Sequence, residues 1–587
     1  MVGELNALWG RIIADELAKA GIETAVLAPG SRSTPMTVAL AEHPDIEPVS
    51  HLDERSAAFF ALGYAKRTGT PAPLVCTSGT ALANFHPAVV EADAARVPMV
   101  LLTADRPPEL SDSGANQTID QHRFYGDSVR DYRTLPEPEA TERKLRSLRT
   151  TLARGVGTSI GTMPGPIHLN VPLRKPLEPN ATDESVPEGV PDGTLPNGFE
   201  GRDRAATSGR DGPFVETIRG RARLSDEERR RIADAIEHAE AGLIVCGPTE
   251  GGSPSREALD SLALETGFAV VADPLSSHRF GTHHEEVVVC GGYDGYVSTL
   301  DATPDVVIRF GASPTSKALR HYLRDSGARQ FVVDPAGGWR EATFTATDLV
   351  ISDETQTATD LAAAVDRKRD PFADALANAE SEYWSIVGGE EPPEGAILAD
   401  VVDLAPDPST LFVSNSMPVR DIDRFGRPRE ADVTALGNRG ASGIDGITSS
   451  ALGAGYGTDD PLVLVTGDLA YYHDMNGLLA VSRSGVDATI VCLNNDGGGI
   501  FHLLPIEEHE TFEEWFRTPH GLDFEHSAAL YDLGFARADG RREFRDRYAE
   551  SLESDGTQVI EVQTDSERSH EERRRLARAV ADRFRDE

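Results

Sequence analysis

The chain has 587 residues, of which 39% are hydrophobic and 26% charged, and its formal net charge is −39 at pH 7. One hydrophobic core does not extend over this length, so we expect three or four domains. The strong negative charge argues against a nucleic-acid-binding protein.

No apolar run approaches the about 20 residues that cross a bilayer. The N-terminal stretch "MVGELNALWGRIIADELAKAG" has the pattern of an amphipathic helix rather than of a secretory signal. We therefore expect a soluble, cytoplasmic protein. The four cysteines are scattered without metal-ligand spacing, which favours buried apolar side chains in a reducing compartment: Cys76, Cys246, Cys290 and Cys492.

Residues 1–178 alternate between helical stretches and short apolar runs that end in Gly, Pro or polar residues. The runs are "ETAVLAPG", "EPVSHLDE", "APLVCTSGT", "VPMVLLTAD" and "GPIHLNVP". This alternation predicts an α/β domain with a parallel sheet, in which ligands bind beyond the carboxyl ends of the strands. Residues 179–222 are rich in Pro, Gly, Asp and Ser and lack apolar periodicity, so we expect an acidic linker.

Two further α/β domains are predicted, over residues 223–370 and 390–587. The first has the runs "AGLIVCG", "FAVVADP", "DVVIRFG" and "QFVVDP", without a G-x-G-x-x-G that opens a helix, so it gives little support to a dinucleotide site. The second has "TLFVSNS", "VTALGN", "PLVLVTGD", "ATIVCLNND" and "TQVIEVQT". The predicted fold is therefore α/β, with three doubly wound parallel-sheet domains.

Two apolar runs of the last domain end in oxygen-bearing side chains. Asp468 follows the first run, and Asn495 follows the second, one helical crossover later. If the two strands are neighbours, both side chains lie at one edge of the sheet. A carboxylate and an amide oxygen suit Mg²⁺, which takes its remaining ligands from phosphate and water, and the glycines after Asn495 allow close backbone approach. Ordinary polar loop ends are the alternative, and the pairing of the two motifs argues against it.

This pattern resembles the diphosphate motif of thiamine-diphosphate enzymes. Such enzymes need a glutamate from a different α/β domain, which hydrogen-bonds the aminopyrimidine ring of the cofactor. Glu54 in "HLDERSAAFFALGYA" follows a strand and opens a helix, as that role requires. Helix-end electrostatics alone would also favour a carboxylate there. In this superfamily the two elements meet across a subunit interface, which implies a homodimer at least.

Four arginines follow strands of the outer domains: Arg32, Arg106, Arg420 and Arg439. A planar guanidinium matches a carboxylate with two parallel hydrogen bonds, so four of them near one cofactor predict a substrate with several carboxylates. Surface salt bridges are the alternative for each arginine taken singly. Gln117 and Ser416 lie in the same strand-end loops.

The motifs together resemble the 2-succinyl-5-enolpyruvyl-6-hydroxy-3-cyclohexene-1-carboxylate synthases of menaquinone biosynthesis. The matching runs are "APGSRSTP", "DERSAAFFALG", "SGTALAN", "LLTADRPPEL", "GANQ", "NRGASGIDG", "GDL" and "NNDGGGIF". They cover both outer domains, and the resemblance is faint in the middle one. It implies a thiamine-diphosphate-dependent transferase that decarboxylates 2-oxoglutarate and adds the remaining carbon unit to isochorismate. It also implies Mg²⁺ or Mn²⁺ and a homodimer or homotetramer with active sites at the subunit interface.

The resemblance assigns roles by position. Glu54 would be the catalytic glutamate, and the metal would be held by Asp468, Asn495 and the backbone carbonyl of Gly497. The cofactor would also contact Asn415, Gly443, Ile444, Gly467 and Leu469. The substrates would contact Ser31, Arg32, Arg106, Gln117, Lys317, Ser416, Arg420, Arg439, Ile500 and Phe501.

Two positions depart from the family pattern. A Lys-Arg pair of the family corresponds to Lys317 and Ala318, so one cation is missing, and Arg320 is the nearest replacement. Ala470 stands where the family often has a small hydroxyl residue near the diphosphate.

Three alternatives make different demands on the sequence. An acetolactate synthase-like carboligase that uses pyruvate would need a flavin site in the middle domain and fewer arginines. A catalytically silent scaffold would have lost Glu54 or the metal ligands. A redox protein of the Rossmann class would carry a glycine fingerprint, which is missing.

The charge balance generates a prediction about salt. Lysine occurs at only six positions, so the surface is acidic and its self-repulsion needs screening. The screening length is about 3 Å at 1 M salt and about 10 Å at 0.1 M. We expect the protein to be folded in molar KCl and to unfold on dialysis to about 0.1 M, as followed by circular dichroism. A chain equally stable in both would contradict salt adaptation.

Overall fold

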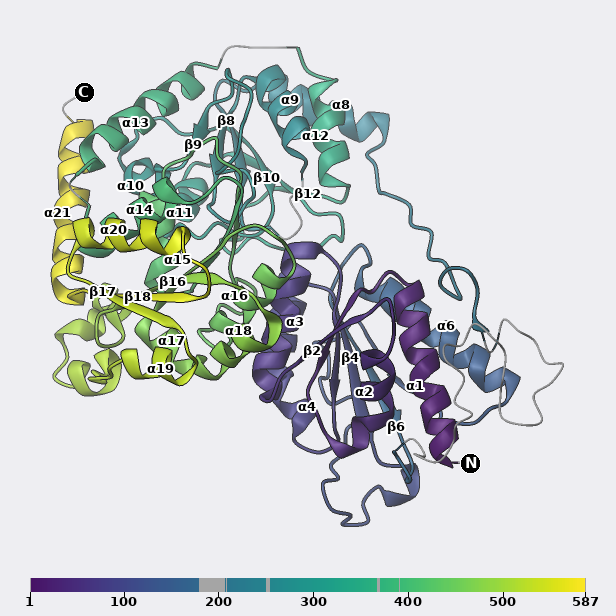
Figure 1. The fold of residues 1–587 in the computed structure, drawn as a ribbon. Coiled ribbons are helices and arrows are strands. Elements are labelled where there is room, and N and C mark those ends of the chain that lie inside the picture. Colours follow the sequence, from purple (N-terminus) through teal and green to yellow (C-terminus); the bar gives the residue numbers. More distant parts are fainter. Residues whose placement is uncertain are drawn as a thin grey trace. The chain divides into compact units, whose positions relative to one another are not determined.

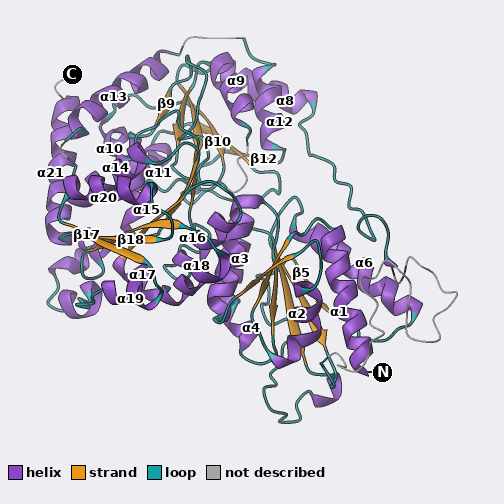
Figure 2. Cartoon of the chain, in the orientation of Figure 1, coloured by secondary structure: helices purple, strands orange, loops and turns teal. Residues whose placement is uncertain are grey.

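The computed structural model describes residues 2–178, 206, 208–249, 254–366, 370–389 and 391–585 (Figure 1). Three six-stranded sheets flanked by helices make up the described chain, and every strand pair in them is parallel (Figure 2). This confirms the predicted α/β class with three parallel sheets. Most of the predicted linker, residues 179–205 and 207, lies outside the described residues.

The chain divides into two compact units. We call residues 1–219, 440–458 and 474–486 the first unit, and residues 220–439, 459–473 and 487–587 the second unit. The first unit contains one sheet and the second contains two.

The sheet of the first unit has the order β2-β1-β3-β4-β6-β5. Its strands are β1 (Thr24–Leu27), β2 (Glu47–Ser50), β3 (Pro73–Cys76), β4 (Met99–Asp105), β5 (Asp131–Thr134) and β6 (Pro166–Pro172). The helices of this unit are α1 (Val2–Lys19), α2 (Thr34–Ala41), α3 (Glu54–Thr68), α4 (Ala81–Asn84), α5 (His86–Ala95), α6 (Glu142–Ser159), α16 (Ile447–Tyr456) and α18 (Leu479–Ser484). The predicted N-terminal helix is α1, whose apolar side chains enter a core with those of α2, α6 and the strands.

The middle sheet has the order β12-β11-β10-β7-β8-β9. Its strands are β7 (Gly242–Cys246), β8 (Ala269–Ala272), β9 (Val289–Cys290), β10 (Val306–Phe310), β11 (Arg329–Val333) and β12 (Asp348–Val350). Numbered within the sheet, this is the order of dinucleotide-binding folds, although the glycine fingerprint is missing from the sequence. The accompanying helices are α8 (Asp226–Glu237), α9 (Arg256–Thr266), α10 (Tyr293–Tyr296), α11 (Lys317–Asp325), α12 (Glu354–Ala362) and α13 (Pro371–Val387).

The third sheet has the order β14-β13-β15-β16-β18-β17, which repeats the order of the first sheet. Its strands are β13 (Ser409–Val413), β14 (Val433–Leu436), β15 (Leu462–Gly467), β16 (Ala488–Asn494), β17 (Gly534–Ala538) and β18 (Gln558–Gln563). The remaining helices of the second unit are α14 (Pro393–Leu404), α15 (Met417–Phe425), α17 (Asp468–His473), α19 (Glu525–Leu530), α20 (Arg541–Leu552) and α21 (Ser566–Arg585). Side chains of α14, α15 and α20 share one apolar core with β13, β15 and β16.

Two helices of the first unit approach each other unusually closely. A side chain at Gly63 of α3 would lie 1.8 Å from the carbonyl oxygen of Ser450 in α16, and one at Gly453 of α16 would lie 2.0 Å from the carbonyl of Phe60. Only glycine lets the two backbones come this near. The helix that begins at Glu54 is therefore fixed against the helix that follows residues 440–446.

Four edge strands are absent from the runs predicted from sequence: β5, β9, β12 and β17. Each is only partly buried, in contrast to the fully buried central strands β7, β13 and β16. A half-exposed strand needs no continuous apolar run, so its sequence gives a weak signal.

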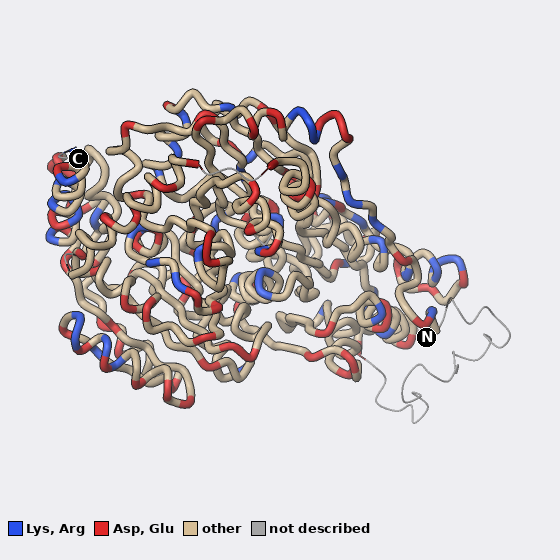
Figure 3. The backbone as a smooth tube through the Cα atoms, turned by 90° about the horizontal axis from the view of Figure 1, so that it is seen from above, with Lys and Arg blue, Asp and Glu red and all other residues tan. Residues whose placement is uncertain are grey.

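The expectation for the cysteines is confirmed. All four cysteines are buried and free. Acidic residues are scattered along the described backbone rather than gathered in one stretch (Figure 3). In the part of the chain that the structure describes, no helix has the length and apolar character needed to cross a membrane.

Candidate functional site

The residues predicted to form the site fall into two groups, one in each unit. The first unit contains Ser31, Arg32, Glu54, Arg106, Gln117, Gly443 and Ile444. The second unit contains Lys317, Asn415, Ser416, Arg420, Arg439, Gly467, Asp468, Leu469, Asn495, Gly497, Ile500 and Phe501. Within each unit most of these residues follow strands of one sheet at its carboxyl edge.

Two of the predicted substrate arginines lie near each other in the first unit. Arg32 follows β1 and Arg106 follows β4, and burial together with the charge of Arg106 lowers the pKa of Arg32. Arg32 is only 5% exposed, and its Nη1 donates to the carbonyl of Leu173 at 2.7 Å. The Nε of Arg106 is buried without a hydrogen-bond partner among the described residues. Both guanidinium groups thus make some hydrogen bonds within the fold, while the Nε donor of Arg106 remains unsatisfied.

Gln117 lies beside the loop after β3. Its Nε2 donates to the carbonyl of Ser78 at 3.0 Å, and the Ser78 hydroxyl donates to the Gln117 carbonyl at 3.1 Å. Ser31 and Arg32 form a short 3-10 turn after β1, and the backbone N–H of Arg32 donates to the Thr77 hydroxyl at 3.3 Å. The structure therefore brings these loops together at the same edge of the first sheet.

Glu54 is the first residue of α3. Asp53 caps the helix by accepting hydrogen bonds from the backbone N–H groups of Arg55 and Ser56. The Glu54 carboxylate is half-buried and makes no hydrogen bond or ion pair with another residue that the structure describes. Because Asp53 already satisfies the helix terminus, capping does not account for Glu54, and its carboxylate remains available to a ligand.

A buried carboxylate holds the loop that contains Gly443 and Ile444. Glu91 of α5 accepts hydrogen bonds from the backbone N–H groups of Gly440 at 2.8 Å, Ala441 at 2.6 Å and Ser442 at 3.3 Å. Lys66 of α3 lies 3.8 Å from Glu91, and both side chains are buried. The loop is thus fixed through its backbone, a role that sequence inspection does not detect.

Asp474 joins the beginnings of α3 and α16. It accepts hydrogen bonds from the Ser449 backbone N–H at 2.7 Å and from the Ser449 and Ser56 hydroxyls at 3.2 and 3.5 Å, and Arg55 lies 3.7 Å away. Burial raises the pKa of Asp474 to about 6. This contact places Glu54 and the loop 440–446 at one end of the same helix pair.

The second unit contains the predicted metal ligands. Gly467 at the end of β15 pairs with Leu493 of β16, so Asp468 and Asn495 leave the sheet side by side. Asp468 Oδ2 accepts the backbone N–H groups of Asn495 at 3.1 Å and Gly497 at 2.9 Å, and its Oδ1 accepts that of Leu469 at 2.6 Å. Burial raises the pKa of Asp468 despite these donors, so a bound cation would stabilise the ionised form.

Asn495 supplies the test of whether these residues fit a cation. Its Oδ1 is buried without a hydrogen-bond partner among the described residues, which is costly for an amide oxygen unless a ligand occupies it. Gly497 has φ 142°, and a side chain there would lie 2.0 Å from the Arg517 carbonyl. No group of three or more His, Cys, Asp or Glu side chains in the described chain could hold a metal. One carboxylate with amide and backbone oxygens fits Mg²⁺ or Mn²⁺.

A histidine that is not among the residues predicted from the sequence also lies at this site. His520 Nε2 lies 3.3 Å from Asp468 Oδ2, and its Nδ1 accepts the backbone N–H of Leu522 at 3.0 Å. With Nδ1 accepting, Nε2 carries the proton and donates to Asp468. His520 stands in an irregular loop far along the chain from Asp468, so neither spacing nor periodicity could have identified it.

Arginines also gather in the second unit. Burial and the positive charges of Arg439 and Arg320 lower the pKa of Arg420. Arg439 Nη1 donates to Asn415 Oδ1 at 2.8 Å, and Arg420 Nη1 donates to the Ser416 carbonyl. Lys317 is exposed at the start of α11. The guanidinium groups of Arg320, Arg420 and Arg439 thus lie near one another. Arg320 is on α11, the helix that also contains Ala318, where the family pattern has a cation.

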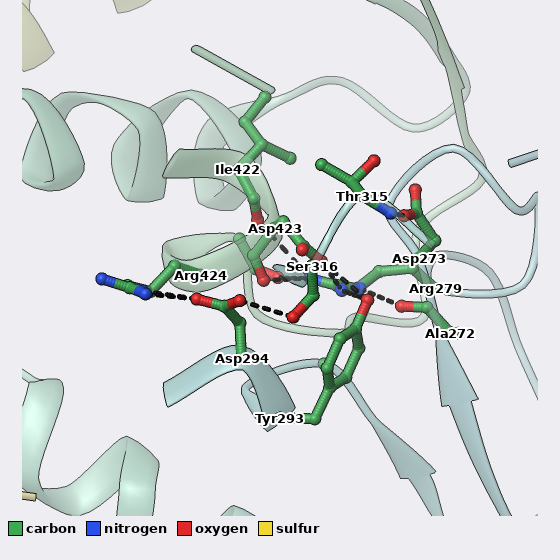
Figure 4. Close-up of polar contacts among 12 residues, drawn as sticks. Ala272, Asp273, Arg279, Tyr293, Asp294, Thr315, Ser316, Ile422, Asp423 and Arg424 are labelled. Atoms are coloured by element: carbon green, nitrogen blue, oxygen red, sulfur yellow. Dashed lines mark hydrogen bonds and ion pairs between the residues drawn. The ribbon is translucent and has the colours of Figure 1, made fainter. Parts of the chain in front are cut away.

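A buried polar network connects the helices that carry these arginines (Figure 4). Ser316, the N-cap of α11, donates to Asp294, which also accepts Arg424 Nε of α15 at 2.9 Å. The neighbouring Asp423 pairs with Arg279 at 2.8 Å and accepts the Tyr293 hydroxyl at 2.7 Å. Burial raises the pKa of Asp423 to about 7. The network fixes α11 relative to α15, and therefore Arg320 relative to Arg420.

Backbone strain occurs in several of the predicted loops. Gln117, Ser416, Ser442 and Asp496 all have positive φ, and Ser416 has φ 71° and ψ −126°, outside the regions that non-glycine residues prefer. Strained residues persist where the surroundings hold them, and they gather at functional sites.

The apolar residues that were predicted to line the substrate site are also at the edge of the third sheet. Ile500 and Phe501 lie partly buried in a 3-10 turn after the glycines, and Phe501 packs edge-on against Phe516 with ring centroids 5.7 Å apart. Ala470 is buried in α17, directly after Leu469.

Two family models match the chain. "Thiamine pyrophosphate enzyme, N-terminal TPP binding domain" matches residues 9–124, and "Thiamine pyrophosphate enzyme, C-terminal TPP binding domain" matches residues 431–562. The matched segments contain Glu54 and the Asp468–Asn495 pair respectively. The chain is therefore an enzyme of the thiamine-diphosphate type, with the three-sheet fold of that type.

Curated relatives are similar over nearly the whole chain. Proteins named 2-succinyl-5-enolpyruvyl-6-hydroxy-3-cyclohexene-1-carboxylate synthase are 70% identical in Natronomonas pharaonis and 60% identical in Haloarcula marismortui, over 98% of this chain and of each relative. A protein of the same name from Roseiflexus sp. is 44% identical over 96% of both chains. The chain belongs to the family of 2-succinyl-5-enolpyruvyl-6-hydroxy-3-cyclohexene-1-carboxylate synthases.

Proposed function

We propose that this enzyme decarboxylates 2-oxoglutarate and adds the remaining four-carbon unit to isochorismate by conjugate addition, giving 2-succinyl-5-enolpyruvyl-6-hydroxy-3-cyclohexene-1-carboxylate for menaquinone biosynthesis. The observation that carries the proposal is the cluster of Arg320, Arg420 and Arg439, in the unit that also contains the orphaned Asn495 oxygen. Both proposed substrates are dianions, and guanidinium groups bind carboxylates in pairs of hydrogen bonds.

The cofactor is thiamine diphosphate, whose ring serves, when bound, as the electron sink for loss of carbon dioxide from a 2-oxoacid. Asp468, Asn495 Oδ1 and the Gly497 carbonyl would hold Mg²⁺ or Mn²⁺ against the diphosphate. Asn415, Gly467 and Leu469 would line the same end of the cofactor, and Gly443 and Ile444 its aminopyrimidine end. Because Ala470 has no hydroxyl, a phosphate contact there would come from backbone N–H groups.

Glu54 would hold a proton between its carboxylate and the aminopyrimidine ring. Its carboxylate has no competing partner in the described chain, which supports this role.

The substrates would be bound and oriented by residues of both units. Those of the first unit are Ser31, Arg32, Arg106 and Gln117. Those of the second unit are Lys317, Ser416, Arg420 and Arg439, with Ile500 and Phe501 as an apolar wall. Much of the rate would come from this orientation.

The active assembly would be a homodimer or homotetramer in the cytoplasm, with each active site at a subunit interface. Exposed apolar side chains support an interface. Leu52, two residues before Glu54, is 59% exposed, and Trp515 is 68% exposed. An acetolactate synthase-like reaction with pyruvate is less well supported, because pyruvate has a single carboxylate to match the several arginines predicted to bind substrate.

The direct test is an assay of the purified protein in high salt with thiamine diphosphate, Mg²⁺, 2-oxoglutarate and isochorismate. We expect carbon dioxide and the adduct to appear in equal amounts, as measured by coupled absorbance and mass spectrometry. Carbon dioxide without adduct would indicate a simple decarboxylase, and turnover of pyruvate at a comparable kcat/KM would favour the acetolactate synthase-like alternative.

Replacement of Glu54 by Gln should lower kcat by about 100-fold or more, because the amide cannot exchange a proton with the cofactor ring. Thiamine diphosphate binding and the melting temperature should change little, since the side chain has no structural partner in the described chain. The matched control is Glu23→Gln. Glu23 is an exposed carboxylate just before β1, at the edge of the first sheet opposite to Glu54. Activity near wild type in Glu54→Gln would reject the assignment.

Arg320 is proposed to supply the cation that is missing at Ala318. Arg320→Ala should lower kcat/KM by about tenfold, the value of one charge-assisted hydrogen bond. Arg324→Ala on the same helix should leave it unchanged, because Arg324 is exposed and paired with Asp325 at 2.7 Å. The double variant Ala318→Arg/Arg320→Ala should recover activity. Equal kcat/KM in the two single variants would contradict the role of Arg320.

A further inference from the structure

The orientation of one side-chain amide decides whether the cation site can form. Asn495 presents an oxygen acceptor at one end and an NH₂ donor at the other, and only the oxygen can bind a cation. In the structure Nδ2 donates to Glu394 Oε1 at 3.0 Å, while Oδ1 has no hydrogen-bond partner in the described chain. The amide is therefore turned the way a metal requires.

Glu394 is placed so that it can only accept. It lies in the first turn of α14 and is 2% exposed. Its Oε1 also accepts the Thr564 hydroxyl at 3.0 Å, and its Oε2 accepts Arg573 Nη2 at 2.7 Å. Both oxygens of this carboxylate accept hydrogen bonds, so a flipped amide would place Asn495 Oδ1 against Glu394 Oε1, which are both acceptors.

Arg573 connects this carboxylate to α15, the helix that contains Arg420. From α21 it donates Nη2 to Glu394, and it also pairs with Asp421 of α15 through Nε at 3.2 Å and Nη2 at 2.6 Å. Arg573 and Asp421 are both buried, and Asp421 follows Arg420. One buried guanidinium therefore bridges two carboxylates and holds α14, α15 and α21 together.

We propose that Glu394 is a positioning residue of the cation site, which fixes the Asn495 amide with Oδ1 toward the metal, and that Arg573 holds Glu394 in that position. The inference rests on the proposed function, because it presumes a divalent cation at Asp468 and Asn495. It adds a residue from α14 and one from α21 to a site otherwise made of loops after β15 and β16.

The test compares Mn²⁺ binding by the full chain in high salt with saturating thiamine diphosphate, with free Mn²⁺ measured by electron paramagnetic resonance. In Glu394→Gln the new NH₂ group can face Arg573, where two donors would oppose each other. Alternatively it can face Asn495, whose amide would then flip so that Oδ1 accepts from Gln and no longer faces the metal. We expect Mn²⁺ affinity to fall by about 10- to 100-fold, the usual effect of losing a partner behind a metal ligand.

The controls separate positioning from folding. Thr564→Val removes the other donor to Glu394 Oε1 without touching Asn495, and should change Mn²⁺ affinity less than about twofold. Melting temperatures measured without metal report any purely structural damage. Asp468→Ala should abolish binding. If wild type itself fails to bind Mn²⁺, both the proposed cation site and this inference fail. If wild type binds and Glu394→Gln binds equally well, only this inference fails.

A compensating change keeps the test decisive if Glu394→Gln folds poorly. Asn495→Asp offers oxygen at both ends but places a carboxylate against Glu394, and adding Glu394→Gln supplies a donor to it. The double variant should bind Mn²⁺ at least as tightly as Asn495→Asp and more tightly than any folded Glu394→Gln protein. A double variant that binds more weakly than Asn495→Asp would overturn the proposal.

Discussion

Parallel strands deliver all of their carboxyl ends to one edge of a sheet, and the candidate site depends on this constraint. The first and third sheets have the same strand order, so the loops after corresponding strands occupy corresponding places. In the first sheet that edge carries Glu54 and the arginines after β1 and β4. In the third it carries Asp468 and Asn495, after β15 and β16. The residues predicted to form the site are thus divided between the two units.

Buried carboxylates hold the loops of both halves. Glu91 binds three consecutive backbone N–H groups of the loop before Gly443, and Asp474 joins the ends of α3 and α16. Asp468 does the same for the loop after Asn495, and Glu394 turns the Asn495 side chain. Each accepts hydrogen bonds from otherwise unsatisfied donors, which offsets the cost of burial. In this acidic chain some carboxylates are therefore internal, in addition to those that charge the surface.

The sequence predicted the parts of the fold whose causes are local. Buried central strands such as β15 and β16 are continuous apolar runs, and Asp468 and Asn495 are visible because they end those runs. The edge strands β5, β9, β12 and β17 were missed because half-exposed strands lack that pattern. Glu394, Arg573, Glu91 and His520 were missed for another reason. Their roles depend on contacts with residues far away in the sequence, and nothing in their own neighbourhoods distinguishes them from other charged residues.

The central claim is that the two groups of residues form one active site shared between subunits, and mixing inactive subunits tests it most directly. Glu54→Gln and Asp468→Ala chains, each inactive alone, would be co-expressed in equal amounts and the activity of the mixture measured. In a dimer with shared sites, half of the assemblies are mixed and one of their two sites is intact, so activity should return to about a quarter of wild type. If each site were built from a single chain, no mixture would recover activity, and that result would contradict the account.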